Sequence, residues 1–458
     1  MAPACVLLDR TVTFRNHPEE PEPLMGEEGA AAVVVVTTAT SSSEPLSLES
    51  MEAEHAKYMR AMIKPSLQVV DAPGISRLTL AGQNMPSDFL VAAADKNLVV
   101  LYAGRPSSWY QGPYLVIDAA SSSLSTIPGI RGHDHDYMFD GYSAVVVARE
   151  GGAFVLAELL FGFRRAGAPV LGKLCLWQSS CSSDQQGSEW VYKVGHLPAQ
   201  VSHAWRVHVS FHVQSRDLLC WVDLLQGLLL CDLGRHCNVD SPDLGISFVP
   251  LPDSCSISEE RRRSLNPQEF RTVACVDGEI KFFNIHGFTE RGSISLVTYA
   301  LNLDDGPSRS WTEETVLLLD DLWADQTFIS MGVPRITPMF PYLSTQERDI
   351  VYLVIPGDLE YDEEGYRTRL VKFLLSVDTR RTKVMSATQE NCPSTLFSSR
   401  YLLAFNASLS AALPDLKFHK ARVLLSLRRT QVLSFINSNC RAVEAIEMGA
   451  SGKKMKFE

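Results

Sequence analysis

The chain lacks the features that suit a protein to a membrane, to secretion or to nucleic acid. None of its 458 residues fall in an apolar stretch of the roughly 20 residues that a membrane-spanning helix needs. Its 42 Lys and Arg are outnumbered by 53 Asp and Glu, for a formal net charge of -11, so a basic face for nucleic acid is not expected. The N-terminus has no basic segment followed by an apolar one, as a secretory signal would. We therefore expect a cytoplasmic or nuclear protein without membrane or nucleic-acid partners.

Sequence signatures of common catalytic sites are also missing. There is no glycine-rich phosphate loop, no nucleophile elbow and no defensible pair of catalytic carboxylates. The ten cysteines lie mostly inside apolar runs, as in Leu174-Cys175-Leu176, which is typical of buried hydrophobic residues in a reducing compartment. We therefore assign no catalytic, cofactor-binding or metal-binding residue, expect no cofactor, and predict that the protein is not an enzyme.

Five clusters of titratable residues could bind a ligand, but each is better explained as ordinary structure. They are His133–Asp136; Cys231, His236 and Cys237; His203, His208 and His212; Asp320, Asp321 and Asp325; and Arg261–Arg263. The first lacks a further ligand nearby and lies in an expected loop, and the second has no standard zinc spacing. The three histidines suit alternating faces of a strand, where partly buried, hydrogen-bonded histidines are ordinary. The acidic and basic clusters are expected in solvated surface loops.

The most informative stretch is Leu218–Leu233, LLCWVDLLQGLLLCDL. Two short apolar runs flank Asp223–Gly227, where glycine can adopt a positive φ angle. Apolar runs this short, bounded by turn residues, are typical of strands buried on both faces. A helix is the alternative because Leu is a good helix former, but Gly227 and the Trp221-Val222 pair favour a hairpin. Trp221 is expected in the core.

The same strand–turn–strand unit recurs from Asp88 onward. Five units are legible, at a spacing of roughly 45–65 residues that lies near the range of β-propeller blades. Gly151-Gly152 and Asp277-Gly278 are expected at hairpin tips with positive φ angles. Residues 6–14 and Ser66–Leu80 could supply a sixth unit, since an N-terminal strand paired into the array would remove an exposed edge. We predict an all-β fold, a β-propeller-like array of about five to six four-stranded blades, with a β-sandwich pair as the alternative.

Three segments of the chain resemble the DUF1618 family, a group of proteins of unknown function that is abundant in grasses. They are WVDLLQGLLLCDL at 221–233, FVPLP at 248–252 and FRTVACVDGEIKFFNI at 270–285, and the flanks 6–14 and 392–402 also fit. Their order and spacing follow the family pattern, although Leu228 stands where the family usually has Ile. The resemblance implies a plant protein, and it brings no catalytic residues because none is established for the family.

These patterns predict a β-propeller-like region at 1–402, with a DUF1618-like core at about 218–350, and a C-terminal extension at 403–458 that is partly mobile. The run Ala30–Ala39 is expected to be a buried strand and not a membrane anchor. We predict a non-enzymatic interaction scaffold for an unknown protein partner, which loops such as Gln178–Glu189 and Asp304–Ser310 would contact. The alternative is an enzyme or small-ligand binder with its site in the central channel.

Overall fold

The computed structural model describes most of the chain between Cys5 and Phe405. The described ranges are 5–16, 63–82, 89–104, 112–121, 123–130, 137–138, 143–162, 170–179, 189–202, 204–236, 244–262, 264–289, 292–304, 309–361, 367–393 and 402–405. All of them belong to one compact unit, Met1–Leu416, which is the unit described below. The other unit, Lys417–Glu458, and the run Ala30–Ala39 lie outside the described ranges. Within these ranges, no helix has the length and apolar character needed to cross a lipid bilayer.

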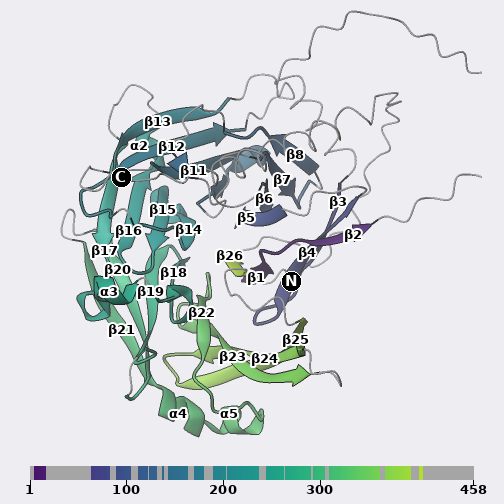
Figure 1. Cartoon of the computed structure of the whole chain (residues 1–458), viewed down its shortest axis with the longest axis vertical. Helices are drawn as coiled ribbons and strands as arrows, with labels where there is room; N and C mark the ends of the chain where they lie inside the picture. Colours follow the sequence, from purple (N-terminus) through teal and green to yellow (C-terminus); the bar gives the residue numbers. More distant parts are fainter. Residues whose placement is uncertain are drawn as a thin grey trace, which may run out of the picture. The chain divides into compact units, whose positions relative to one another are not determined.

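Five sheets of four antiparallel strands follow one another along the chain as the blades of a β-propeller (Figure 1). The first holds β5 (Phe89–Asp95), β6 (Leu98–Ala103), β7 (Tyr114–Asp118) and β8 (Ser123–Ile127). The second holds β10 (Val145–Ala148), β11 (Phe154–Gly162), β12 (Leu171–Gln178) and β13 (Val191–His196), with β9 (Tyr137–Met138) also on β11. The third holds β14 (Val209–Val213), β15 (Leu218–Asp223), β16 (Gly227–Asp232) and β17 (Ile246–Pro250). The fourth holds β18 (Arg271–Val276), β19 (Glu279–His286), β20 (Ser295–Asn302) and β21 (Ser310–Leu318). The fifth holds β22 (Met339–Leu343), β23 (Ile350–Tyr361), β24 (Arg367–Asp378) and β25 (Lys383–Pro393). The strands of each sheet pair in sequence order, which confirms the predicted all-β propeller array.

The predicted hairpin at Leu218–Leu233 is confirmed. β15 and β16 pair in register from Leu218 with Asp232 to Asp223 with Gly227. Glycine is required at position 227 because a Cβ there would collide with the carbonyl oxygen of Val249 on the next strand. The indole of Trp221 is fully buried, and its Nε1 donates a hydrogen bond of 2.7 Å to the Ser143 carbonyl of the second blade. The central hairpin therefore also joins two blades.

Both predicted glycine turns lie at hairpin tips. Gly151 and Gly152, in the short 3-10 turn η1 (Glu150–Gly152) between β10 and β11, have φ angles of 70° and 79°. Asp277 and Gly278, between β18 and β19, have φ angles of 49° and 82°. Positive φ at both central residues matches the right-handed twist of the flanking strands.

Helices are few and short. The described ones are η1, η3 (Gln214–Arg216), α2 (Leu233–His236), η4 (Asp253–Cys255), α3 (Glu259–Arg262), η5 (Pro267–Glu269), α4 (Leu319–Ala324) and α5 (Gln326–Ser330). Two charged clusters were predicted to lie in loops, and this prediction is wrong for most of their residues. Arg261 and Arg262 lie on α3, and Asp320 and Asp321 lie on α4. Asp325 caps α5 by accepting a hydrogen bond from the Phe328 amide at 3.2 Å. Capping and the burial of apolar side chains such as Phe328 favour helices where composition suggested loops.

A sixth sheet combines the two ends of the described chain. It contains β1 (Val6–Asp9), β2 (Thr13–Asn16), β3 (Lys64–Gln68), β4 (Ile75–Gly82) and β26 (Leu402–Phe405). β1 pairs antiparallel with β26 on one side and parallel with β4 on the other, so the sheet is mixed. The predicted sixth unit therefore exists, but it is not built as a four-stranded antiparallel blade. β26 also extends from Leu402 to Phe405, past the predicted domain boundary.

This sixth sheet lies between the fifth blade and the first. On one side, Cys5 and Leu7 pack against Tyr352 of the fifth blade. On the other side, the Val91 amide of the first blade donates a hydrogen bond of 2.9 Å to the Arg10 carbonyl. Since β1 and β26 also pair with each other, the strands nearest the two chain ends close the array and leave fewer free sheet edges.

The hydrophobic core is divided into clusters that lie between neighbouring sheets. β16 illustrates the arrangement, because Leu228 and Leu230 pack in a cluster shared with the fourth blade. The alternate residues Leu229 and Cys231 pack in a cluster shared with the second blade. Both faces of the strand are therefore buried, which explains why its sequence is a continuous apolar run without polar alternation.

Polar contacts also join the first turn of each blade to the first turn of the next. They are Ala148 N to Asp95 Oδ2 at 2.9 Å, Arg149 to Asp217 at 2.8 Å, Ser215 Oγ to Gly278 O at 2.8 Å, and Asp277 N to Thr345 O at 3.1 Å. Turn residues thus link successive blades in addition to ending their strands.

Replacing Trp221 by Ala should destabilise the protein by about 3–5 kcal/mol, because it empties a large core site and leaves the Ser143 carbonyl unpaired. Urea unfolding of the purified protein would measure the change. Val316→Ala is a matched control at a residue that is 53% exposed, and its effect should stay within about 0.5 kcal/mol. A loss below about 1 kcal/mol for Trp221→Ala would contradict this account of the core.

Deleting residues 402–458 should lower the thermal midpoint by roughly 5 °C or more, because β1 loses its antiparallel partner β26. Deleting only residues 417–458 keeps β26 and should change the midpoint little. Differential scanning calorimetry of the two truncations and the full chain distinguishes these outcomes. Equal midpoints for both truncations would show that β26 does not close the array.

Candidate functional site

The sequence candidates for metal binding are not brought together. His133–Asp136, His203 and Cys237 lie outside the described residues. Cys231 is fully buried in the core, and burial raises the pKa of its thiol to about 12. In the described part of the chain, no three His, Cys, Asp or Glu side chains converge as a metal site. Cys231 therefore packs as a hydrophobic residue, as the sequence predicted.

The two described histidines near the start of the third blade each have an interaction partner. Nε2 of His212 lies 2.8 Å from Oδ1 of Asp217, and Nδ1 of His208 accepts a hydrogen bond of 3.3 Å from the Leu224 amide. Burial lowers the pKa of His212, although the hydrogen bond that its imidazole donates to the Asp217 carboxylate opposes this. These contacts confirm the prediction of partly buried, hydrogen-bonded histidines.

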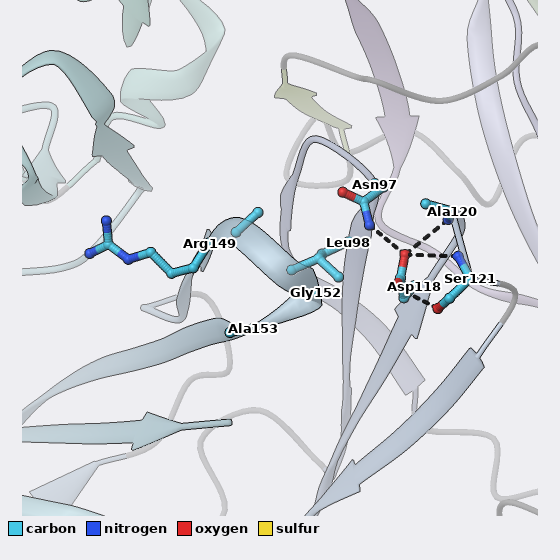
Figure 2. A pocket seen from close by; sticks show the side chains of 9 residues that line it. Asn97, Leu98, Asp118, Ala120, Ser121, Arg149, Gly152 and Ala153 are labelled. Atoms are coloured by element: carbon cyan, nitrogen blue, oxygen red, sulfur yellow. Dashed lines mark hydrogen bonds between the residues drawn. The ribbon is translucent and has the colours of Figure 1, made fainter. Parts of the chain in front are cut away.

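A hollow of about 410 Å³ lies between turns of the first and second blades (Figure 2). Its polar lining centres on Asp118, which accepts hydrogen bonds from Asn97 Nδ2, from the Ala120 amide at 2.9 Å and from Ser121 Oγ at 2.5 Å. Burial by itself would raise the pKa of Asp118. The hydrogen bonds that it accepts together have the larger, opposite effect, so its pKa lies below the ordinary value. Asp118 is therefore an ionised carboxylate that organises its own turn.

Arg149, the cation beside this hollow, does not bind Asp118. Figure 2 shows the Arg149 side chain extending away from Asp118. Its guanidinium instead donates two hydrogen bonds to Asp217 of the third blade, at 2.8 and 3.0 Å. The hollow thus presents one carboxylate with its acceptors largely used, and we assign it to the packing between blades.

A second group of polar side chains has more varied chemistry, and we call it the Cys–His cluster. Its atoms are Ser254 Oγ, Cys255 Sγ, His286 Nε2 and Tyr299 OH. The imidazole nitrogen lies 3.6 Å from the thiol and 3.0 Å from the phenol, while the serine hydroxyl lies 3.8 Å from the thiol and 3.1 Å from the phenol. The cluster joins the segment after β17, in η4, to β19 and β20 of the fourth blade.

Arg271 holds this cluster in place from β18. Its guanidinium donates to Asn284 Oδ1 at 2.8 Å, to the Leu224 carbonyl at 3.0 Å and to the Cys255 carbonyl at 2.5 Å. The side chain is 4% exposed, and burial lowers the pKa of Arg271 to about 10, so it stays protonated at neutral pH. A buried cation with an acceptor at each of its three nitrogens therefore positions the backbone that carries the thiol.

The electrostatics of the cluster keep its acids protonated. Burial raises the pKa of the Cys255 thiol, and burial likewise raises the pKa of the Tyr299 phenol to about 12. A thiol in this state is a poor nucleophile because the thiolate is the reactive form. Sequence reasoning missed the cluster because its residues come from three separated segments, and only tertiary packing brings them together.

A buried carboxyl group lies between the first and second blades. Glu158 on β11 is completely buried and accepts hydrogen bonds from the Tyr114 hydroxyl and from Ser143 Oγ, the latter at 3.0 Å. Burial raises the pKa of Glu158 to about 8. The group is therefore mostly protonated near neutral pH, which lowers the cost of burying it.

The strand arrangement defines the class of protein: the chain is a β-propeller protein with polar clusters buried between its blades. Residues 221–352 match the family described as "Protein of unknown function (DUF1618)". The match begins at Trp221 inside the central hairpin and includes Cys255, and it confirms the resemblance of the sequence over this part of the chain.

Comparison with other proteins adds no function. No curated protein matches the chain. A crystal structure of a protein of unknown function from Dyadobacter fermentans DSM 18053 is similar over 70% of this chain and 88% of its own, with 12% sequence identity and a TM-score of 0.32. A similarity at that level supports no conclusion about the fold or the function of this chain.

The buried Glu158 should make stability fall as pH rises. Its folded pKa of about 8 exceeds its ordinary 4.5, so its contribution is complete below about pH 4.5 and is lost as pH rises through 8. Glu158→Gln cannot ionise and should reduce the loss of unfolding free energy between about pH 6 and pH 9 by on the order of 3 kcal/mol. Urea unfolding at both pH values measures it.

The exposed Glu260 on α3 supplies the matched control, Glu260→Gln, which should follow the wild-type pH dependence. Identical pH profiles for Glu158→Gln and the wild type would show that Glu158 is not the titrating group.

Proposed function

We propose that this protein is a non-enzymatic β-propeller scaffold that binds another protein along the outer edge of its second blade. The observation that carries the proposal is the exposure of β13, where Val191 is 39%, Tyr192 37% and Val194 50% exposed. Within the described residues β13 is the outer strand of its sheet, and β12 is its strand partner. Large apolar side chains on an open strand edge are a known feature of protein-binding surfaces.

The geometry of this edge suits an extended segment of the partner. β13 pairs with β12 from Leu171–His196 to Leu176–Val191 without a bulge, so it is a regular template for a further strand. Tyr192 and Val194 share one face of β13 because side chains alternate along a strand. The partner we propose therefore adds a strand to β13 and has apolar side chains at alternate positions. The predicted contact loops at Gln178–Glu189 and Asp304–Ser310 lie mostly outside the described residues.

The chemistry of the described polar groups supports a non-enzymatic role. Asp118, Arg149 and Arg271 are each engaged in contacts that hold turns or blades together. Burial raises the pKa of Cys255, which keeps the thiol of the Cys–His cluster in its unreactive form. These groups serve packing in the geometry described, and the proposal treats them as structural.

We also propose a plant protein of the cytoplasm or nucleus. Six cysteines of the described ranges are free thiols and five of these are buried, which is the state that reducing compartments maintain. The plant origin rests on the DUF1618 resemblance.

Affinity capture from plant cell extract, quantified by mass spectrometry, tests the scaffold. Val194→Glu places a charge on the proposed edge and should reduce recovery of the specific partner by about 10-fold or more. Val316→Glu is the matched control on the outer strand β21 of the fourth blade, at a residue that is 53% exposed. A partner retained equally by both variants would overturn the assignment to β13. Turnover of a substrate by the purified protein would overturn the non-enzymatic proposal.

A further inference from the structure

The connection between the third and fourth blades carries a basic run that neither the fold nor the proposed binding edge uses. Arg261 and Arg262 lie on α3 in this connection, and Ser264 and Leu265 follow them. Ser264 is the only Ser or Thr of the whole sequence with arginine at both the third and the second position before it. The chain therefore presents two arginines, one intervening position, a serine and then a large apolar residue.

The hydroxyl of this serine lies at the protein surface. Ser264 is exposed, and its Oγ donates a hydrogen bond of 3.2 Å to the Arg261 carbonyl. The Ser264 amide donates to the same carbonyl at 3.3 Å, so a local turn holds the residue. Arg261 is exposed as well. The serine and one of its two arginines are therefore accessible to a large partner such as an enzyme.

The backbone around the serine has little regular structure to lose. The backbone hydrogen bonds described within 258–264 join residues three or four positions apart, and α3 is a single turn of four residues. A helix this short has little stability of its own. Extending the segment costs the 2.9 Å bond from Arg261 to Thr289 and the partial packing of Leu265 on the core, but no strand pairing of a blade.

We propose that Ser264 is a phosphorylation site for an arginine-directed serine/threonine protein kinase. Such a kinase recognises its substrate by acidic side chains that pair with arginines before the serine, and guanidinium groups suit this pairing because they bind carboxylates with two parallel hydrogen bonds. An apolar residue after the serine suits a hydrophobic pocket of the same groove. Arg261, Arg262 and Leu265 supply these three determinants.

The chemistry is a phosphoryl transfer in which the kinase binds MgATP as the co-substrate. The Ser264 Oγ gives its proton to the catalytic base of the kinase and forms a bond to the γ-phosphorus of ATP. The bond from the γ-phosphorus to the oxygen that bridges it to the β-phosphorus breaks, and ADP leaves. The product is a phosphate ester on Ser264.

The modification would reverse the charge of this connection. The three arginines of 261–263 exceed the two glutamates of 259–260 by one positive charge. A phosphoryl group adds about -1.5 to -2 at pH 7. The ester oxygen can no longer donate, so the hydrogen bond from Ser264 Oγ to the Arg261 carbonyl is lost. This inference concerns the connection after the third blade and is independent of the proposed binding edge on β13.

Incubation of the purified full-length protein with MgATP and an arginine-directed kinase tests the site. The probe is the catalytic subunit of cyclic-AMP-dependent protein kinase. Mass spectrometry of the digested protein should locate a phosphoryl group on Ser264, and Ser264→Ala should abolish it. Ser256→Ala is the matched control, since Ser256 is an exposed serine of the same connection with no arginine in the three positions before it, and this variant should retain the wild-type incorporation.

The role of the arginines has its own variants at exposed positions. Arg261→Gln should lower the initial rate of phosphorylation at Ser264 by about 10-fold or more, because the kinase loses a charged partner. Glu260→Gln removes a charge from the same turn and should not slow the reaction. Circular dichroism checks that both variants fold. Absence of phosphate from Ser264 in the wild type, or equal rates for Arg261→Gln and the wild type, would overturn the proposal.

Expression of the tagged chain in plant cells tests the site inside a cell. Phosphopeptide mapping of the purified protein, after treatment of the cells with a phosphatase inhibitor, should find phosphate on Ser264. A chain whose Ser264 carries none under these conditions would contradict the proposal.

Discussion

The constraint on which the structure depends is that each sheet has two apolar faces and must be covered on both. In β16, Leu228 and Leu230 face one neighbouring blade while Leu229 and Cys231 face the other. A single blade cannot bury both faces alone, so each is stable only between two others. The continuous apolar runs of the strands therefore have the same cause as the arrangement of the blades, which is the burial of both faces of each sheet.

This constraint extends to the ends of the array. A row of five blades would leave one apolar face bare at each end. The sixth sheet covers both faces, with Cys5 and Leu7 against the fifth blade and Arg10 bonded to the first. Because β1 and β26 come from opposite ends of the described chain, their pairing also joins the termini of the fold without a covalent link. Closure depends on a sheet that is only partly antiparallel.

Burial between blades also sets the chemistry of the polar groups found there. Glu158 is held protonated by desolvation, while Asp118 is kept ionised by hydrogen bonds from its own turn. Arg271 stays charged in the core because its guanidinium donates to three acceptors. The same packing that stabilises the fold also raises the pKa of the Cys255 thiol, which therefore stays protonated 3.6 Å from Nε2 of His286.

The strand content, the central hairpin and the glycine turns could be predicted from the sequence because they depend on neighbouring residues. Short apolar runs, Gly227 and Asp277-Gly278 specify local conformations that hold wherever the strands pack. The short helices α4 and α5 were missed because their stability comes from a cap at Asp325 and a buried Phe328, which matter only in the packed state.

The sequence by itself therefore determined an all-β chain of repeated hairpins with buried cysteines. The tertiary structure alone decided which strands pair across the ends of the chain, since β1 and β26 are nearly 400 positions apart in sequence. It also decided that Cys255, His286 and Tyr299 meet, because each lies in a different segment and no spacing rule relates them. Local preferences act over a few residues, whereas contacts between sheets are set by the burial of whole faces.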